Sequence, residues 1–264
     1  MSEFKKYRNL IWELSKNDFK KRYAGSSLGR VWAFVQPIVT VVLYYFVFGL
    51  VLPGRAPYDS DVPYVIYLTA GLVPWFFFNE AVTTGANVMH EYNYLVKKVV
   101  FKVSILPFIK TISATFIHLF FICVLLAMYF LYGFKPSVQI IELLYYSFCL
   151  FMMALAITYI TSAVTVFFKD LLQIINILLM FGMWGTPILW HISQLPAKAQ
   201  QLEPLFRFNP VNYVIEGYRS ALFEGTWVHE RWLDTLVFWG IVAVLFAIGA
   251  YVFKKLRPLF ADVL

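Results

Sequence analysis

Residues 105–131 read ILPFIKTISATFIHLFFICVLLAMYFL, and Lys110 is the only Lys, Arg, Asp or Glu in this run. About 20 consecutive apolar residues are enough for a helix to cross the hydrocarbon core of a bilayer. Lipid offers the backbone no hydrogen-bond partner, so a crossing segment of this kind must be helical. The run therefore predicts a transmembrane helix and places the chain among integral membrane proteins.

Further apolar runs of similar length follow the same logic. They cover residues 32–52, 64–86, 139–167, 171–190 and 233–253. Hydrophobic residues make up 61% of the 264 residues and charged residues 14%, whereas soluble domains contain about 25% charged residues. A soluble fold of this size cannot hide so much apolar surface. We predict an all-α integral membrane protein with six transmembrane helices.

The distribution of Lys and Arg predicts the orientation of these helices. Residues 1–30 contain eight of them, and the loop after the second run, together with the start of the next run, adds Lys97, Lys98, Lys102 and Lys110. Basic residues concentrate on the cytoplasmic side of membrane proteins, so we expect both termini in the cytoplasm. We expect no cleavable signal peptide, because the first apolar run begins only near Trp32. The net charge of +7 largely reflects this asymmetry, and we expect no nucleic-acid partner.

Residues 1–30 form the first predicted region, ahead of a six-span domain at 31–264. Apolar side chains from Phe4 to Phe19 recur at helical spacing among the basic residues. This pattern is typical of an amphipathic helix in the inner headgroup layer. Such a helix can serve as a plain membrane anchor, and it can also gather anionic lipid headgroups near a pore entrance.

Two connections carry helical signals of their own. The polar segment from His90 to Lys102 predicts a short amphipathic cytoplasmic helix, which is either a docking element or an ordinary solvated loop. In the external region 190–232, Asn209-Pro210 is typical of a helix start and Gly225 suits its end. We expect helices in this external region to insert partly into the membrane.

Few side chains in the predicted spans have catalytic chemistry. Glu80 and His118 are ionisable, and each is either a hydrogen-bonded packing residue or an acid–base group. No phosphate-binding loop, nucleophile triad or metal-ligand motif is present in the sequence. We therefore predict a chain that is not an enzyme, does not hydrolyse ATP by itself and needs no metal or cofactor of its own.

Aromatic residues are abundant, at 20% of the chain. A stripe on the first span includes Phe34, Val41, Tyr44, Tyr45 and Phe48, and the fifth span adds Met180, Phe181 and Trp184. These side chains either pack against other helices or line a channel for sugars. Aromatic rings can stack on the apolar faces of sugar rings, while tyrosine hydroxyls can bond to sugar hydroxyls.

Six short segments, in order along the chain, resemble one known family. They are DFKKRY at 18–23 with SLGRVW at 27–32, AGLVPWFFF at 70–78, LVKK at 95–98, FFKD at 167–170, TPI at 186–188, and Asn209-Pro210 with Tyr218-Arg219. Together they are similar to the permeases of polysaccharide-exporting ABC transporters of the ABC-2 type. The chain departs from the family at Phe101-Lys102, where many members have Phe-Pro, and at Lys169, where Arg is commoner.

The resemblance implies a bacterial plasma-membrane exporter. It implies a homodimer of this chain bound to two copies of a separate ABC ATPase subunit, which holds ATP and Mg. The exported substrate would be a polysaccharide linked through pyrophosphate to undecaprenol, such as O-antigen or wall teichoic acid. Within this chain the resemblance also implies four sets of site residues. A gate for the lipid pyrophosphate would consist of Lys20, Arg22, Tyr23 and Arg30, and the aromatic stripes would line the channel. Coupling to the ATPase would involve His90, Glu91, Tyr94, Lys97 and Lys98, and the external exit would involve Asn209, Tyr213, Tyr218 and Arg219.

Other functions compete with this interpretation. An ABC efflux permease for drugs or small lipids would present a similar aromatic stripe. A membrane enzyme that modifies lipids belongs to a different class, and it would use Glu80 and His118 as acid and base. A secondary transporter is disfavoured, because the predicted spans show neither an intramembrane charge network nor an inverted repeat.

Overall fold

The computed structural model describes residues 2–22, 29–51, 62–98, 101–135, 137–191, 196, 201, 206 and 208–264. Within these residues the chain is helical and contains no strand, so the predicted all-α fold class is confirmed. The helices are α1 (Ser2–Arg22), α2 (Trp32–Tyr45), α3 (Tyr64–Ala86), α4 (Val88–Glu91), α5 (Asn93–Val96), α6 (Leu106–Leu131), α7 (Glu142–Thr165), α8 (Leu171–Gly185), α11 (Pro210–Arg219), α12 (Trp232–Leu256) and α13 (Phe260–Val263).

Single turns of other helix types extend several of these elements. Helix α2 continues as a π-helix over Phe46–Val51, and α11 continues in the same way over Ser220–Glu224. Short 3-10 turns precede or follow the long helices at Gly29–Val31, Val103–Ile105, Val138–Ile141, Val228–Arg231 and Arg257–Leu259.

Five helical stretches are long and apolar enough to cross a membrane. They are Trp32–Val51, Tyr64–Ala86, Val103–Leu131, Val138–Thr165 and Val228–Val263. The fifth predicted span, 171–190, is shorter than expected, because α8 ends at Gly185. Thr186 adopts an extended conformation, as expected for a residue that precedes a proline. The count of six crossings therefore stays a prediction.

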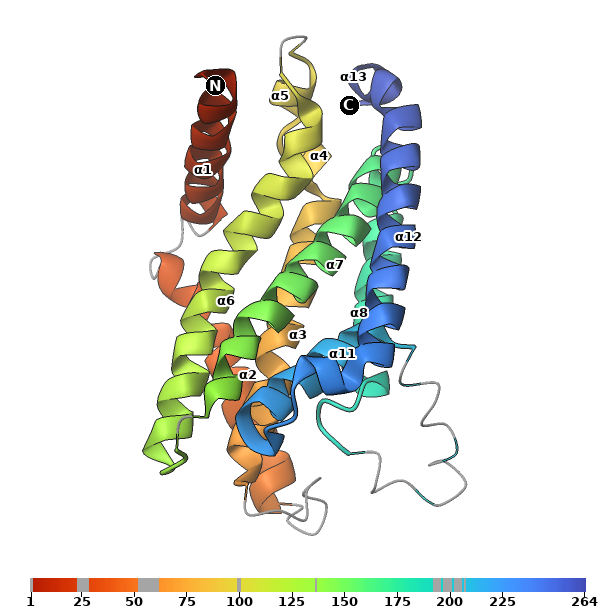
Figure 1. Cartoon of the computed structure of the whole chain (residues 1–264). Coiled ribbons are helices and arrows are strands. Elements are labelled where there is room, and N and C mark those ends of the chain that lie inside the picture. The colour runs from red at the N-terminus through yellow and green to blue at the C-terminus, as the bar shows by residue number, and fades with distance from the viewer. Residues whose placement is uncertain are drawn as a thin grey trace.

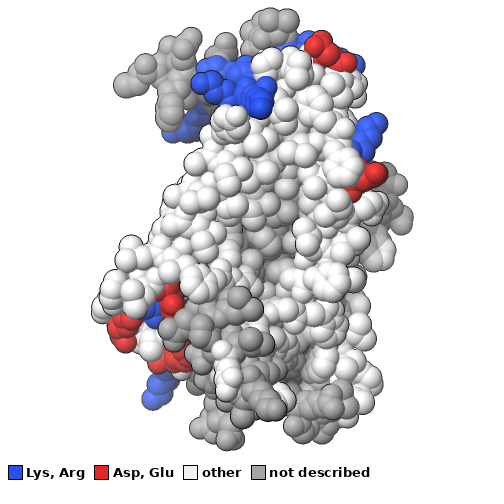
Figure 2. Space-filling view, turned by 90° about the vertical axis from the view of Figure 1, so that its right-hand side faces the viewer, with Lys and Arg blue, Asp and Glu red and all other residues white. Residues whose placement is uncertain are grey.

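The two ends of the chain lie at the same end of the helix bundle. Figure 1 shows the start of α1 and α13 there, together with α4 and α5. Figure 2 views the side of the bundle that carries α12, and charged side chains on this face gather towards its two ends. Among the described residues drawn in this view, the band between them shows no Lys, Arg, Asp or Glu, as a lipid-facing surface requires.

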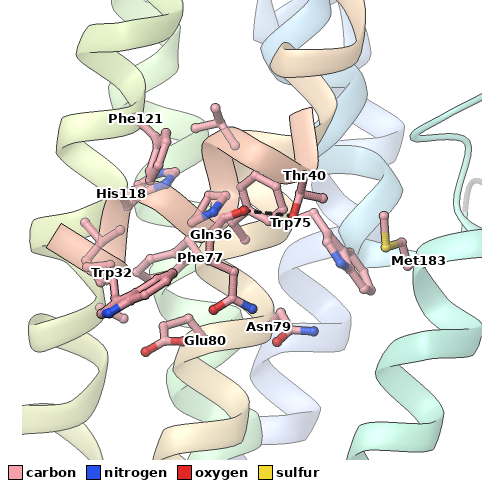
Figure 3. Close-up of a pocket in the computed structure, with 16 residues that line it drawn as sticks. Trp32, Gln36, Thr40, Trp75, Phe77, Asn79, Glu80, His118, Phe121 and Met183 are labelled. Carbon is pink, nitrogen blue, oxygen red and sulfur yellow. Dashed lines mark hydrogen bonds between the residues drawn. The ribbon is translucent and has the colours of Figure 1, made fainter. Parts of the chain in front are cut away.

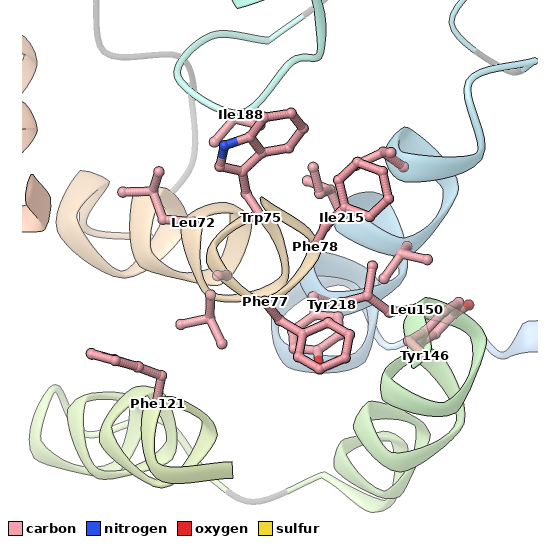
Figure 4. Packing of buried hydrophobic residues seen from close by; sticks show 14 of the residues in the cluster. Leu72, Trp75, Phe77, Phe78, Phe121, Tyr146, Leu150, Ile188, Ile215 and Tyr218 are labelled. Carbon is pink, nitrogen blue, oxygen red and sulfur yellow. The ribbon is translucent and has the colours of Figure 1, made fainter. Parts of the chain in front are cut away.

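Helix α3 occupies the centre of the bundle. It packs against α2, α6, α7, α8 and α11, and most of its residues are buried. In Figure 4, which looks along α3, the side chains of Trp75, Phe77 and Phe78 point in different directions towards the surrounding elements. A helix that is apolar on all sides must be covered on all sides. The packing of the other helices follows from this requirement.

Helix α11 confirms the helix start predicted in the external region. The side chain of Asn209 accepts a hydrogen bond from the backbone N–H of Val211 at 3.0 Å, and Pro210 occupies the first turn. Gly225 ends the following π-helical turn with φ = +70°, a conformation that glycine adopts at little cost. Helix α11 is largely buried against α3 and α7, so it belongs to the core of the bundle.

We predict that Gly217→Ala in α11 destabilises the protein. A Cβ at Gly217 would overlap the ring of Tyr146, which is fully buried. Such overpacking costs about 1–3 kcal/mol, and it should lower the thermal unfolding midpoint in detergent by several degrees. The matched control is Gly240→Ala in α12, where a Cβ would meet nothing within 4 Å; this variant should be as stable as the wild type or slightly more stable. Equal midpoints for both variants would contradict the packing of α11 on α7.

Candidate functional site

A half-open pocket of about 240 Å³ lies between α2, α3, α6 and α8. Its walls combine aromatic rings with neutral and acidic polar groups, and Figure 3 shows these side chains around the space between the helices. Aromatic side chains come from Trp32, Trp75, Phe76, Phe77 and Phe121, and polar side chains come from Gln36, Thr40, Asn79, Glu80 and His118. The volume is below the roughly 300–1,000 Å³ of pockets that enclose whole ligands, so the pocket suits one ring or segment of a longer molecule.

The chemistry of the pocket suits a neutral molecule rich in hydroxyl groups. Indole and phenyl rings offer flat apolar surfaces. The amides of Gln36 and Asn79 both donate and accept hydrogen bonds, and the carboxylate of Glu80 accepts them. Such a wall can hold a polyhydroxyl molecule through many weak contacts without fixing one orientation.

Gln36, Thr40 and Asn79 were not among the site residues predicted from the sequence. Gln36 and Thr40 are spaced by one helical turn and are the polar residues of an otherwise apolar run, and Asn79-Glu80 interrupts another such run. A polar side chain inside a span usually faces protein or a watery cavity. This rule would have drawn attention to Gln36 and Asn79, but only the fold shows that α2 and α3 bring them together.

The aromatic stripe of α2 faces the bundle. Phe34, Val41, Tyr44, Tyr45 and Phe48 are partly buried against the main core cluster. The ring of Phe34 lies 4.3 Å from that of Phe120, and the Tyr44 hydroxyl donates to the sulfur of Met183 at 3.8 Å. These contacts agree with the first of the two predicted roles of the stripe, packing against other helices. The exposed side of α2 carries Ile38, Val39, Val42 and Leu43 instead, and Phe46 continues it at the start of the π-helical turn.

The predicted residues on α8 are placed differently. Met180, Phe181 and Trp184 are all more than half exposed in the single chain. Only Ile175 and Leu179 of α8 are buried. Helix α8 therefore presents its predicted channel residues on an uncovered face, and the lining role of both stripes stays a prediction.

Little of the predicted gate lies within the described part of the chain. Lys20 is exposed near the end of α1. Tyr23 lies outside the described residues, as do the side chains of Arg22 and Arg30. Their predicted role at the lipid pyrophosphate is therefore untested.

The predicted coupling segment forms two single-turn helices. Helices α4 and α5 meet at Tyr92, whose backbone departs from helical angles, so the single short helix expected there is broken. His90 Nε2 hydrogen-bonds the backbone oxygen of Thr165 at 2.9 Å, which ties α4 to the end of α7. Of the predicted coupling residues, Glu91, Tyr94, Lys97 and Lys98 are exposed. They remain accessible to a partner at this end of the bundle.

A buried ionic cluster joins this segment to α1 and α6, and we call it the Lys110 cluster. The ammonium of Lys110 lies 2.6 Å from a carboxylate oxygen of Asp18 and 2.6 Å from one of Glu91. The hydroxyl of Tyr92 donates to the same Asp18 oxygen at 2.7 Å. The side chains of Lys110 and Asp18 are 3% and 0% exposed, while that of Glu91 is 45% exposed. The ammonium of Lys110 on α6 therefore pairs with carboxylates from both α1 and α4.

The sequence held a signal for this cluster. Lys110 is the only charged residue of its apolar run, and such a charge requires a partner. The sequence did not predict which carboxylate pairs with it, because Asp18 and Glu91 lie 92 and 19 residues away along the chain.

The charge state of Asp18 follows from this environment. Burial by itself would raise the pKa of Asp18, but the charge of Lys110 and the hydrogen bonds from Lys110 and Tyr92 outweigh burial and lower the pKa below its ordinary value of 3.8. A lowered carboxyl pKa stabilises the fold above that ordinary value, and the contribution is lost as the pH falls through the pKa of the folded state. The pair therefore persists at neutral pH.

The predicted exit residues lie on and beside α11, mostly inside the bundle. Asn209 donates to the Thr186 hydroxyl at 2.9 Å. Tyr213 shares a hydrogen bond with Thr235 at 2.8 Å, and Tyr218 shares one with His118 at 2.9 Å. His118 is thus a hydrogen-bonded packing residue, and its ring also lies 4.8 Å from that of Phe77. The proposed role of α11 in an exit stays a prediction.

Arg219 fastens α11 to the turn after α8. Its guanidinium donates to the backbone oxygens of Pro187 at 2.7 Å and Ile188 at 2.8 Å, and to the carboxylate of Glu216 at 2.9 Å. It also lies 3.7 Å from the centre of the Tyr67 ring on α3. With only 1% of its surface exposed, Arg219 is a structural residue that holds three elements together.

Comparison with known proteins identifies the family. The family model described as ABC-2 type transporter matches residues 9–223, which run from α1 into the π-helical turn after α11. The chain belongs to the ABC-2 type transporter family. The ABC-2 chain is also 29% identical over 259 residues to an O-antigen export system permease protein RfbA of Klebsiella pneumoniae, covering 97% of this chain and 95% of the relative. It is 26% identical over 260 residues to a protein of the same name from Myxococcus xanthus, covering 98% and 97%.

Family membership confirms the resemblance found in the sequence. It also identifies the ABC-2 chain as the membrane subunit of a transporter rather than a catalyst. The pocket between α2 and α3 and the Lys110 cluster both lie within the matched residues. We therefore treat the pocket as the candidate substrate site, and the Lys110 cluster as a buried connection between α1, α4 and α6.

We predict that Lys110→Met strongly destabilises the ABC-2 chain. Removing one partner of a buried ion pair costs about 3–5 kcal/mol, because the other charge stays buried without it. The matched control is Lys16→Met on α1, whose pair with Glu13 at 3.3 Å is solvent-exposed and contributes about 0–1 kcal/mol. Thermal unfolding in detergent should separate the two variants clearly. Adding Asp18→Asn to Lys110→Met should recover part of the loss, and a lone Lys110→Met as stable as the control would refute the buried pair.

Proposed function

We propose that two copies of this chain form the channel of an ATP-driven polysaccharide exporter in the bacterial plasma membrane. In this proposal the substrate is a polysaccharide linked through pyrophosphate to undecaprenol, such as O-antigen or wall teichoic acid. Two copies of a separate ABC ATPase subunit bind ATP and Mg and supply the energy. Both termini face the cytoplasm, as the distribution of basic residues favours.

The pocket between α2 and α3 is the observation on which the proposal rests. It combines aromatic rings with Gln36, Asn79 and Glu80 inside an otherwise apolar bundle. A hydroxyl-rich chain needs such partners, because its hydroxyls cannot enter lipid without losing hydrogen bonds. The relatives named O-antigen export permeases match nearly the full length of the chain, which favours a polysaccharide over other cargo.

The position of the pocket suits an entry site. Gln36 lies in the second turn of α2, just after α1 and its connection, and Glu80 lies in the last two turns of α3. Both positions are nearer the end of the bundle that holds the chain termini, which is the expected cytoplasmic end. A polymer that enters from the cytoplasm would meet Gln36 and Glu80 on its way to the middle of the bundle, where His118 lines the same pocket.

The uncovered faces of α2 and α8 support a dimer. Ala33 is the only buried residue of α2, and none of the π-helical turn that follows is buried. Helix α8 leaves Met180, Phe181 and Trp184 exposed. A second copy that covers these faces would place the exposed aromatic residues of α8 next to the shared axis. This arrangement would complete a channel from two incomplete halves.

The Lys110 cluster supplies a path from the ATPase to the gate. In the proposal the ATPase contacts α4 and α5 through Tyr94, Lys97 and Lys98. Glu91 in α4 is bonded to Lys110, and Lys110 is bonded to Asp18 in α1. A displacement of α4 therefore moves α1, whose last turn contains Lys20 and Arg22. In this proposal the pairing of Lys110 with Asp18 and Glu91 couples the motions of α6, α1 and α4.

We predict that Gln36→Ala and Asn79→Ala weaken the response to substrate. The test uses the chain with its ATPase in lipid nanodiscs and measures ATP hydrolysis against the concentration of an undecaprenyl-pyrophosphate glycan. Loss of one hydrogen bond of about 1 kcal/mol corresponds to a roughly fivefold higher half-maximal concentration. Leu144→Ala, at an exposed position of α7, is the matched control and should leave the response unchanged. Failure of any ATPase to associate, or a response only to small drugs or lipids, would contradict the proposal.

We also predict that Glu80→Gln leaves substrate-stimulated ATP hydrolysis within about threefold of wild type, since an amide keeps most of the hydrogen-bonding capacity of the carboxylate. Glu80 and His118 line the same pocket, which is the observation that favours the alternative of a lipid-modifying enzyme. An enzyme that used Glu80 as acid or base would lose about 10²–10⁴-fold in rate on this substitution. A loss of that size, in a product assay on a lipid substrate, would establish the enzyme instead.

A further inference from the structure

A second hollow lies at the end of α12, on the side of the bundle away from the candidate substrate pocket. It has a volume of about 580 Å³ and lies between α12, the turn Arg257–Leu259 and α7. Figure 1 shows α12 and α2 on opposite sides of α3. This hollow, which we call the α12 hollow, is therefore separate from the pocket that contains Gln36 and Asn79.

Two basic side chains border the α12 hollow. Lys254 and Arg257 line it and are exposed. Within the described part of the chain, neither side chain forms an ion pair, whereas Lys16, Lys110, Arg219 and Arg231 all pair with carboxylates. Two positive charges one turn apart are therefore available to an anion from outside the chain.

The floor of the α12 hollow is apolar and rigidly packed. Phe253 is buried and contacts the rings of Tyr159 and Phe260 edge-on, with ring centres 5.5 Å apart in each case. The hydroxyl of Tyr159 donates to the backbone oxygen of Ser104 at 2.8 Å, which holds its ring in place. Ala250 and Pro258 complete the wall without adding a polar group. The floor thus offers a preformed apolar surface directly beneath two cations.

The apolar surface continues along α12 beyond the α12 hollow. Val244, Ile248 and Tyr251 are exposed on the same helix, as expected for a helix that faces lipid. On the side of the bundle that carries α12, basic side chains gather towards the end that holds the chain termini, above a band where the described residues in view carry no charge (Figure 2). A ligand that fits must be anionic at one end and hydrocarbon over the rest of its length.

We propose that the α12 hollow binds an anionic glycerophospholipid of the cytoplasmic leaflet, with its phosphate between Lys254 and Arg257 and one acyl chain along α12. The guanidinium of Arg257 can hold two phosphate oxygens at once. Basic clusters at the cytoplasmic ends of spans attract anionic lipid in the same way. The ligand is a resident lipid rather than transported cargo, because the α12 hollow lies across the bundle from the substrate pocket.

Native mass spectrometry of the full chain in detergent tests this assignment. Phosphatidylglycerol is titrated against phosphatidylcholine for the wild type and for the double variant Lys254→Gln/Arg257→Gln. Each cation near an anionic lipid surface contributes about fivefold in affinity. The double variant should therefore bind phosphatidylglycerol about 25-fold more weakly and lose its preference over phosphatidylcholine.

Two matched variants make the test specific. Lys169→Gln removes an exposed cation between α7 and α8, outside the α12 hollow, and should bind phosphatidylglycerol as tightly as the wild type. Ala250→Trp keeps both cations but fills the space for the acyl chain, and it should weaken binding as well. Unchanged binding in the double variant, or an equal loss with Lys169→Gln, would overturn the proposal. Loss of undecaprenyl-pyrophosphate binding without loss of phosphatidylglycerol would also overturn it, because the α12 hollow would then belong to the cargo.

Discussion

The burial of α3 is the constraint on which the rest of the structure depends. Most residues of this helix are buried, and α2, α6, α7, α8 and α11 surround it. Its large side chains, including Trp75 and Phe78, determine how closely each neighbour can approach. The candidate substrate pocket lies where α2 and α8 leave part of α3 uncovered, so that Asn79 and Glu80 face the gap. Helix α3 therefore contributes residues both to the core and to the candidate site.

Buried polar contacts connect the elements that surround this core. Lipid is as apolar as the helix surfaces, so hydrophobicity alone does not bring helices together in a membrane. The Lys110 cluster connects α1 and α4 to α6, and the guanidinium of Arg219 connects α11 to the turn after α8. Arg219 is fully enclosed and bonded to backbone oxygens, which favours a rigid joint. The Lys110 cluster includes the half-exposed Glu91, so its outermost member remains within reach of a partner.

The candidate site depends on contacts that local sequence patterns do not encode. The stripe from Phe34 to Phe48 was recognised from its spacing, but spacing cannot distinguish a face that packs on α3 and α6 from one that lines a channel. The helix start at Asn209 was predicted correctly, because a cap depends on neighbouring residues alone. The burial of Arg219 was not predicted, because its partners at Pro187 and Ile188 come from another part of the chain.

The sequence by itself determined the all-α membrane class, the approximate limits of the long helices and, through its motifs, the ABC-2 family. These properties depend on local composition and on short segments whose meaning does not require the fold. Only the tertiary structure decided that α8 stops at Gly185, that Gln36 meets Asn79 and Glu80 at one pocket, and that Lys110 joins Asp18 to Glu91. The physical reason is that a pocket or an ion pair depends on distances between residues far apart in the chain, and hydrophobic periodicity records only which face of a helix is apolar, not which neighbour covers it.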